Sequence, residues 1–266
     1  MYLSKILMSN IKILIASHKQ FVMPKGEIYL PVQVGRSLSQ NVDLEYQPDN
    51  DGDNISEKNP NFCELTALYW GWKNLQCNYI GLAHYRRHFS IRNPKDKMAS
   101  VLSTEQCEKL CAEYDVILPK RRNYYISSLW NHYKDTHDIS HLELTRAIIA
   151  EDWPQYIYAF DTVMKRTWGH MFNMYIMKKD LSDKYCEWLF DILFKLEKQI
   201  DLVSLSAFDA RLFGRVSELL LDVWIEANQI PYKEIGFVQL GKENWPQKIK
   251  SFICAKFFGK KYSQSR

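Results

Sequence analysis

Four potentially cationic side chains stand close together near the end of the first third of the chain. They lie within residues 81–89, Gly-Leu-Ala-His-Tyr-Arg-Arg-His-Phe, as His84, Arg86, Arg87 and His88. The run begins as an apolar strand pattern, and α/β folds bind ligands at the carboxyl ends of their strands. Adjacent guanidinium groups grip phosphate oxygens bidentately and stay charged at any working pH. The segment therefore predicts an anion site suited to a diphosphate.

A continuous strand through this run would alternate its side chains between two faces. His84, Arg86 and His88 would then share one face. One arginine would face the ligand while the next supports the site from the other side. A structural alternative stays open, in which both arginines pair with buried carboxylates such as Asp115 or Glu64.

The first buried strand is expected at residues 11–17, Ile-Lys-Ile-Leu-Ile-Ala-Ser. A short apolar strand that ends in small polar residues is typical of the first strand of a nucleotide-binding sheet. Ser17, His18 and Lys19 would stand at its carboxyl end. We therefore expect these three residues to border a nucleotide.

Strand and helix patterns alternate along the rest of the chain, which predicts a parallel or mixed sheet. Asn59 and Pro60 mark the start of one helix, and Ser103 with Gln106 forms the capping box of another. The further expected elements are strands at 26–34, 114–119 and 171–177, helical patterns over 126–165, and long helices at 182–199 and 207–228.

Three carboxylates are candidates for a general base. Asp209 and Glu218 lie on or beside the second long helix, and Asp53 is a weaker candidate in a polar loop. For Glu218 the alternative is a solvated helix face on which it pairs with Arg215 three residues away. For the loop at 49–53 the alternative is a surface turn, because its glycine does not fit the calcium-loop pattern.

Composition narrows the function classes. With 266 residues the chain can bury one sizeable core, and its six cysteines include no C-x-x-C pair, which favours a reducing, cytoplasmic compartment over a disulfide scaffold or zinc ribbon. The sequence contains no Walker loop, G-x-G-x-x-G or G-x-S-x-G. This argues against P-loop hydrolases, dinucleotide oxidoreductases and serine hydrolases of the α/β type.

The net charge of +4 is concentrated at the end of the chain, because residues 244–266 hold six basic side chains and no acid. Their apolar neighbours follow near-helical spacing, which predicts a basic amphipathic tail that can lie on an anionic membrane. The alternative is a final helix packed on the domain. Nucleic-acid binding is not expected, since the basic residues do not extend over the body.

Several segments together carry a family resemblance. They are residues 52–56, 61–66, 69–74, 81–87, 115–120, 172–177, 185–189 and 217–218. The chain resembles, from about residue 11 to 240, the glycosyltransferase family of unknown function that recurs in capsular, exopolysaccharide and O-antigen biosynthesis clusters.

The resemblance implies a GT-A-like fold over residues 1–243, followed by the 244–266 tail. Such a fold is a Rossmann-type α/β sandwich with a central mixed sheet and, here, long C-terminal helices. GT-A enzymes usually carry an Asp-x-Asp metal motif where this chain has His84 to Arg87. Fixed positive charge would then replace the metal at the leaving diphosphate. No metal ligand is assigned, and a role for Mn²⁺ or Mg²⁺ stays open.

The family likeness also implies roles and partners. Similarity to Phe-Asn strands of other GT-A enzymes suggests that Asn173 lies near the donor sugar or the acceptor. The expected activity is that of a hexosyltransferase using a nucleotide-sugar donor, most simply UDP-linked, with galactose in pyranose or furanose form as one candidate. The acceptor would be a lipid-linked polysaccharide intermediate at the inner face of a bacterial cell membrane.

Two other classes stay open for the same residues. A non-catalytic module could use the arginine cluster and the tail to bind an anionic membrane surface, and its binding would then depend strongly on salt. A hydrolase of phosphorylated sugars would use the same cationic strand but would turn over the donor with water alone.

Overall fold

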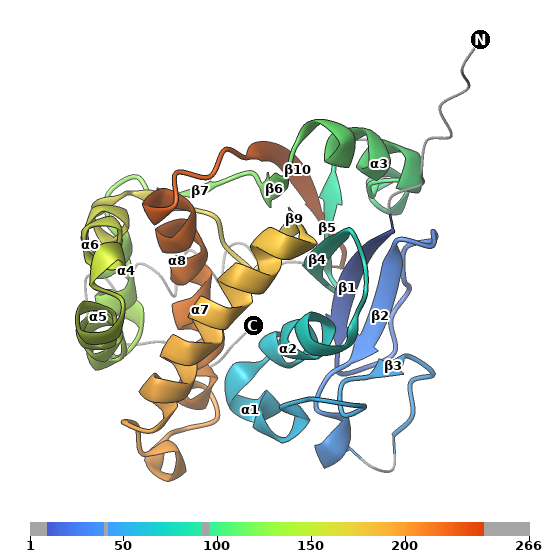
Figure 1. The fold of residues 1–266 in the computed structure, drawn as a ribbon. Helices are drawn as coiled ribbons and strands as arrows, with labels where there is room; N and C mark the ends of the chain where they lie inside the picture. The colour runs from blue at the N-terminus through green and yellow to red at the C-terminus, as the bar shows by residue number, and fades with distance from the viewer. Residues whose placement is uncertain (1–9, 40–41, 92–95, 242–266) are drawn as a thin grey trace.

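The computed structural model describes residues 10–39, 42–91 and 96–241 (Figure 1). The predicted basic tail at 244–266 lies outside the described residues. The described chain forms a mixed α/β structure, as the alternating patterns predicted. Its large sheet has eight strands: β1 (Ile11–Ser17), β2 (Tyr29–Gln33), β3 (Gln47–Pro48), β4 (Tyr79–His84), β5 (Arg87–Ser90), β6 (Val116–Pro119), β9 (Tyr175–Lys178) and β10 (Lys233–Gln239).

The sheet is mixed, with β1 near its centre. β1 runs parallel to β2 and to β4, and Ala16 of β1 is level with His84 of β4. On its other side β4 pairs antiparallel with β9 along most of its length, and with β5 at its carboxyl end. A second, two-stranded sheet joins β7 (Arg122–Asn123) to β8 (Trp168–Gly169). The carboxyl ends of β1 and β4 therefore meet at one edge of the large sheet.

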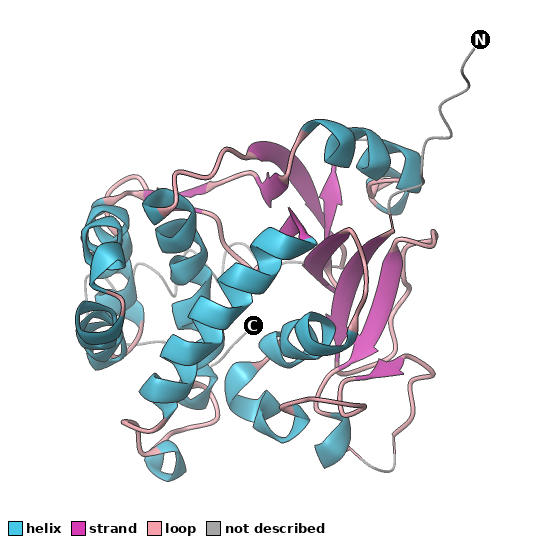
Figure 2. Ribbon diagram, viewed as in Figure 1, coloured by secondary structure: helices cyan, strands magenta, loops and turns pink. Residues whose placement is uncertain are grey.

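Helices cover the sheet on both faces (Figure 2). They are α1 (Asn59–Phe62), α2 (Leu65–Asn74), α3 (Thr104–Glu113), α4 (Leu129–Thr136), α5 (Ser140–Asp152), α6 (Ile157–Lys165), α7 (Lys179–Glu197) and α8 (Leu212–Ala227). The two long helices expected near the end of the domain are α7 and α8. Both carry a buried apolar side, which is the pattern that predicted them.

Two apolar cores lie on opposite faces of the sheet. Leu14 and Ala16 of β1 enter the larger core, which includes buried side chains of α2, α7 and α8. Ile13 and Ile15 enter the smaller core, which includes Cys107 of α3. This alternation along β1 follows from the two-residue period of a strand. The strand is buried on both sides, so its sequence reads as a continuous apolar run.

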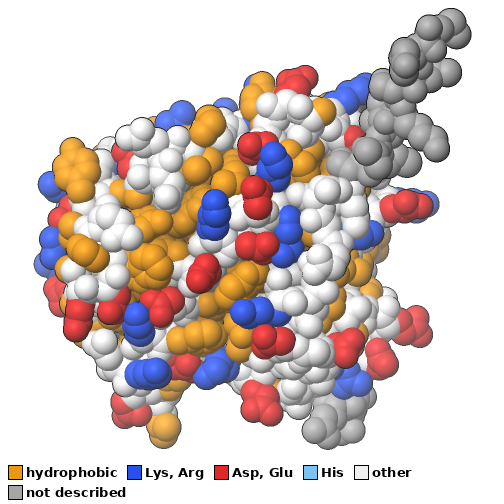
Figure 3. Space-filling model, in the orientation of Figure 1, with side chains coloured by type: hydrophobic (Ala, Val, Ile, Leu, Met, Phe, Trp, Pro, Cys, Tyr) orange, Lys and Arg blue, Asp and Glu red, His pale blue; other side chains and the backbone are white. Residues whose placement is uncertain are grey.

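The outer surface of the helical side mixes charge and apolar groups (Figure 3). Figure 3 shows Lys and Arg side chains interspersed with Asp and Glu, and hydrophobic side chains gathered over the side of the view where α5, α6 and α8 lie. Among the residues with described structure, no helix is long and apolar enough to cross a membrane.

Candidate active site

The carboxyl end of β1 brings cationic groups together with those of β4. Ser17 is buried, and its hydroxyl donates to the carbonyl of Lys19 at 2.7 Å, which closes the turn that leaves the strand. His18 and Lys19 follow at the solvent-accessible edge. Partial burial, and then the charges of Lys19, His84, Arg211 and Arg86, lower the pKa of His18. The charges that act on His18 therefore come from its neighbour Lys19, from the end of β4 and its turn, and from Arg211 before α8.

Tyr85 and Arg86 form a turn, and the predicted continuous strand is wrong at this point. β4 ends at His84, and β5 returns antiparallel from Arg87, with His84 and Arg87 paired. The alternation of His84, Arg86 and His88 on one face therefore does not occur. An apolar strand pattern cannot reveal a two-residue reversal that contains neither Gly, Asn nor Asp.

Three basic side chains lie against the ring of Tyr85, two from the end of β1 and one from the turn itself. His18 meets it edge-on with ring centroids 5.4 Å apart, the Lys19 Nζ lies 5.3 Å from its centroid, and the Arg86 guanidinium carbon lies 5.1 Å from it. Cations are attracted to the electron-rich face of an aromatic ring. Arg86 Nε is buried and has no hydrogen-bond partner among the described residues, and the same holds for His84 Nδ1.

Arg87 and His88 lie on β5, behind the turn. The guanidinium carbon of Arg87 is 4.3 Å from the centroid of the Phe172 ring, and its Nε donates to Gln239 Oε1 at 3.1 Å. His88 is fully buried, and burial is the main cause that lowers its pKa to about 4. His88 is therefore a neutral imidazole inside the protein at neutral pH.

Glu64 is a buried carboxylate that no sequence pattern assigns to the site. Its Oε2 lies 3.5 Å from His84 Nε2, and its Oε1 accepts a hydrogen bond of 2.7 Å from Asn173. Burial opposes its ionisation, but the hydrogen bond and charge of His84, with the Asn173 amide, lower the pKa of Glu64 to about 2. In the alternative interpretation Glu64 pairs with Arg86 or Arg87. In the structure its carboxylate faces His84 instead. Asp115, the other carboxylate named there, lies 3.5 Å from Lys178.

A break in the helix predicted to start at Asn59 and Pro60 places Glu64. Cys63 adopts φ 54° and ψ −128°, which ends α1 and lets α2 start in a new direction with Glu64 at its N-cap. Such backbone is strained for a residue with a side chain. Asn59 helps hold it by donating to the Cys63 carbonyl at 2.8 Å, and Arg211 Nε donates to its sulfur at 3.2 Å.

Asn173 lies in a turn and not in the predicted strand at 171–177. Phe172 and Asn173 have φ of 78° and 54°, and β9 begins only at Tyr175. The buried Asn173 amide donates to Glu64 and, at 2.9 Å, to the carbonyl of Gly214, while its side-chain oxygen accepts from Ser217 at 2.7 Å. These contacts occupy the Asn173 side chain within the protein. Its place in the structure is that of a residue that positions Glu64.

Glu218, one of the candidate bases, belongs to the same cluster. Burial and the negative charge of Glu64 raise its pKa to about 7, against the opposing effects of the Phe172 backbone N–H, Arg87 and Arg122. The alternative pairing with Arg215 is absent between these two described residues. Arg215 instead donates to the Phe208 carbonyl at 2.5 Å and lies over the Phe208 ring.

The other two candidate bases stand elsewhere. Asp209 precedes α8 and accepts a hydrogen bond of 2.6 Å from Ser206. Asp53 is exposed and contacts Asn74, which ends α2 at the opposite end of that helix from Glu64. Across the parts of the chain that are described, no three His, Cys, Asp or Glu side chains form a cluster that could hold a metal ion.

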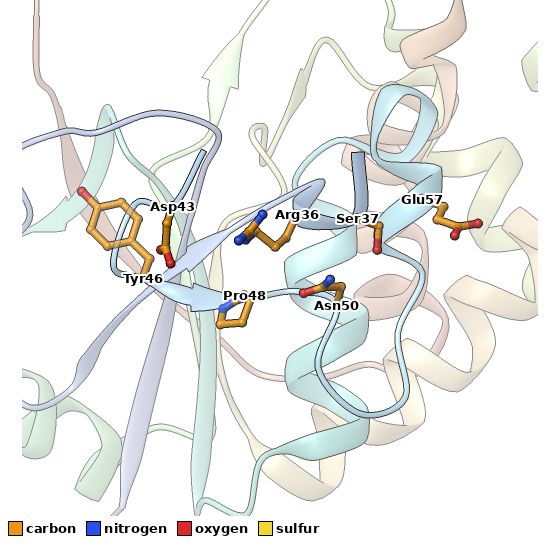
Figure 4. A pocket seen from close by; sticks show the side chains of 7 residues that line it. All are labelled: Arg36, Ser37, Asp43, Tyr46, Pro48, Asn50 and Glu57. Carbon is orange, nitrogen blue, oxygen red and sulfur yellow. The ribbon is translucent and has the colours of Figure 1, made fainter. Parts of the chain in front are cut away.

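An open cavity of about 550 Å³ lies near the carboxyl ends of β2 and β3 (Figure 4). Figure 4 shows Tyr46 and Asp43 toward one end and Glu57 at the other, with Arg36 between them. The Tyr46 hydroxyl donates to the Phe21 carbonyl at 3.0 Å, and the Phe21 ring meets Tyr85 at 5.2 Å. One wall residue of the cavity, Tyr46, is thus linked through Phe21 to Tyr85.

His170, Asp222, Glu234 and Arg121 form a second cluster of ionisable side chains, which the sequence did not predict. His170 has Nδ1 2.5 Å from Asp222 and Nε2 2.9 Å from Glu234, which Arg121 also contacts at 3.1 Å. Although burial opposes it, the hydrogen bonds and charges of both carboxylates raise the pKa of His170. This cluster ties β10 and α8 to the segment that leads into the turn at Phe172. No local sequence pattern marks it, because its members are far apart in the chain.

Comparison with known proteins agrees with this architecture. The model of a family described as a domain of unknown function, DUF4422, matches residues 12–229. A solved structure described as WbbM, a bifunctional glycosyltransferase in its apo form, is similar with a TM-score of 0.81 and 30% sequence identity. The match covers 88% of this chain and 46% of that chain, so this chain spans less than half of that protein. No curated protein matches the chain.

The family predicted from the sequence segments is therefore confirmed. The match extends over most of the described residues and includes Glu64, His84, Asn173 and Glu218. The chain belongs to the DUF4422 family.

Proposed function

We propose that this protein is a glycosyltransferase that moves a sugar from a nucleotide-linked donor to an acceptor hydroxyl. The similarity to a bifunctional glycosyltransferase supports the reaction class. The observation that carries the proposal is the contact of Lys19, from the end of β1, and Arg86, from the turn after β4, with the ring of Tyr85. Departure of a nucleoside diphosphate leaves negative charge on its phosphates, and fixed cations stabilise that charge as it develops.

The diphosphate would lie beside the Tyr85 ring, among the side chains of His18, Lys19 and Arg86. Arg86 Nε is a buried donor without a partner among the described residues, and buried donors are normally satisfied. A phosphate oxygen would supply the missing acceptor. Ser17, His18 and Lys19 would border the same group from β1.

The nucleoside would occupy the cavity near β2 and β3. Its volume of about 550 Å³ is in the range of small-molecule sites, and its walls present charged and amide groups that can bind a base edge or a ribose. The contacts from Tyr46 through Phe21 to Tyr85 support this arrangement of nucleoside and diphosphate.

Glu218 would be the general base. A carboxylate with a pKa of about 7 accepts a proton more readily than an ordinary glutamate at neutral pH. The acceptor hydroxyl would give its proton to Glu218 while its oxygen bonds to the anomeric carbon. The bond from that carbon to the phosphate oxygen breaks, and its electron pair leaves with the diphosphate. Glu64 stays ionised, holds His84 and keeps the pKa of Glu218 high.

The finer parts of the proposal rest on the family resemblance. They are a GT-A arrangement, a UDP-hexose donor, and a lipid-linked acceptor of capsule, O-antigen or exopolysaccharide synthesis. We also propose a cytoplasmic location at the inner membrane face, with the 244–266 tail as one membrane contact. A divalent cation is compatible with this scheme and is left to experiment.

The test is a transfer assay with radiolabelled UDP-, GDP- and CDP-hexoses and bacterial lipid extract as acceptor, with Mn²⁺ or with EDTA. We expect label from one nucleotide class to enter the lipid fraction. Arg86→Ala should abolish transfer and keep the melting temperature, and the exposed Lys109→Ala should transfer normally. Full transfer by Arg86→Ala would remove the assigned diphosphate site, and label released only as free sugar would indicate a hydrolase.

A further inference from the structure

The loop at 124–128 carries the most unusual exposed surface of the described chain. Eight large hydrophobic side chains are exposed among the described residues, and of these only Tyr125 and Ile126 are adjacent in the sequence. Their exposed fractions are 82% and 68%. Single exposed hydrophobic residues need no explanation, but two together at a loop tip indicate a contact surface.

The loop is held in place on both sides. The Tyr124 N–H donates to the Thr167 carbonyl at 2.7 Å, and the Leu129 N–H donates to the Arg166 carbonyl at 2.8 Å. The preceding strand β7 pairs with β8. Tyr125 has φ 56°, a conformation that costs free energy for an aromatic residue and persists only where the surroundings impose it. The fold therefore holds Tyr125 and Ile126 outward.

Positive charge surrounds the base of this loop. The flanking segments 120–122 and 165–166 contribute five cations, and the acids that pair with them are Glu234, with Arg121, and Glu226, with Arg166. The ring of Trp168 lies between two of these cations, with guanidinium carbons at 4.5 and 4.6 Å from its centroid. Exposed aromatic and aliphatic groups with a net positive surround suit the head-group region of an anionic bilayer.

The loop leaves the sheet at the edge that carries the candidate active site. Ile117 of β6 and Gly81 of β4 both pair with Ile176 of β9, so β6 and β4 end at about the same level. Figure 1 shows the segment after β6 running through β7 toward α4 and α6. Arg122 at the start of this segment is near enough to act on the pKa of Glu218. A membrane at the loop would therefore lie next to the active-site edge.

We propose that the 124–128 loop docks this protein on an anionic lipid bilayer, with Tyr125 and Ile126 entering the head-group region and the exposed Lys120, Arg122 and Lys165 facing the lipid phosphates. The proposal gives the proposed transferase its approach to a lipid-linked acceptor, and in that sense it rests on the proposed function. Docking itself requires no catalysis, so it is tested without substrate.

The test is co-sedimentation of the full chain with vesicles of phosphatidylglycerol and phosphatidylcholine. Tyr125→Ser/Ile126→Ser should lower the partition coefficient about tenfold, which corresponds to about 1.4 kcal/mol. The matched control is Val203→Ser, which removes a side chain that is 95% exposed elsewhere. Wild type and control should bind, and should release as salt rises. Equal partitioning of the double variant and the control would overturn the proposal.

A second measurement locates the loop directly. Ile126→Trp and Val203→Trp each add one indole to the same background, and brominated lipids quench only indoles near the bilayer. Extra quenching should occur in Ile126→Trp alone, and its absence would contradict insertion. Nucleotide binding, measured in parallel, should be unchanged in Tyr125→Ser/Ile126→Ser. A wild type that binds vesicles but no nucleotide would refute the proposed function and leave the docking surface standing.

Discussion

The Asn173 side-chain amide donates to Glu64 Oε1 at 2.7 Å and joins two turns that are 109 residues apart in the chain. Both turns use left-handed backbone, at Asn173 and at Cys63. Neither is required by a local pattern of hydrophobic residues. The contact between them sets the position of the carboxylate that holds His84.

Replacing Asn173 tests that contact. Asn173→Ala should destabilise the protein by about 3 kcal/mol, because it removes a hydrogen bond to a charged group and two others, and adds left-handed strain. Asn173→Gly loses the same hydrogen bonds without the strain, and should cost about 1 kcal/mol less. Urea unfolding measures both. Equal costs would show that the backbone conformation adds nothing.

Glu218→Gln tests the proposed base. Transfer should fall by about 10²- to 10⁴-fold, the usual contribution of a positioned base. In the wild type, activity should rise with pH through about 7, because Glu218 must lose its proton to act. That limb should be missing from the residual activity of the variant. A wild-type profile that is flat between pH 5 and 8 would contradict the assignment.

Glu218 should also make stability depend on pH. Its pKa is about 7 in the folded protein, above the ordinary glutamate value of 4.5, so the folded state binds more protons than the unfolded state between these values. The free energy of unfolding must then fall as pH rises from 4.5 to 7. Glu218→Gln should be more stable than the wild type by up to about 3 kcal/mol at about pH 8 and similar at about pH 4. Denaturant titrations at the two pH values check this.

His170 should also make stability fall as pH rises, but here the folded state favours the charged form of the side chain. Its pKa is raised above 6.5, so its pairing with Asp222 and Glu234 contributes stability that is fully present below pH 6.5 and is lost as pH rises through the folded-state pKa. His170→Gln should cost about 3 kcal/mol at about pH 6, since it removes the charge that faces the buried Asp222 carboxylate. The cost should shrink as pH rises through the folded-state pKa of His170. A constant cost would mean that His170 is not charged in the folded state.

Arg211 was not chosen from the sequence as a site residue, and its role is testable. Arg211→Ala should weaken binding of the donor nucleotide about tenfold or more by removing one charged hydrogen-bond donor. Arg211→Lys should recover part of the loss, because it restores the charge without the planar guanidinium. Isothermal titration gives the affinities. Unchanged affinity in both variants would remove Arg211 from the diphosphate site.

The elements that were predicted correctly from the sequence are those whose position follows from the local spacing of apolar residues. The strand at 11–17 and the two long helices appear where expected, because each buries a face that its residue spacing reveals. The segments that build the site depart from those patterns. The helix that starts at Asn59 breaks at Cys63, the strand expected through residues 81–89 turns at Tyr85, and the strand at 171–177 starts only at Tyr175.

The physical reason is the same in each case. Apolar periodicity reports burial, and the buried side chains near these breaks satisfy it whether or not the backbone turns. The turns depend instead on distant partners, such as Gly214 and Ser217 for Asn173, or Arg211 for Cys63. The role of the cationic residues 84–87 could be predicted from the local sequence. The roles of Glu64 and His170 could be seen only in the tertiary structure.

The most direct test of the account is a thermal-shift titration with UDP, GDP and CDP, with and without Mn²⁺, on the wild type and Arg86→Ala. A ligand that binds only the folded state raises the melting temperature by mass action. We predict that one nucleotide class stabilises the wild type, and that Arg86→Ala, with the same melting temperature when free, loses most of this shift. No shift with any nucleotide, or the same shift in both proteins, would contradict a nucleotide-sugar site at the carboxyl ends of β1 and β4.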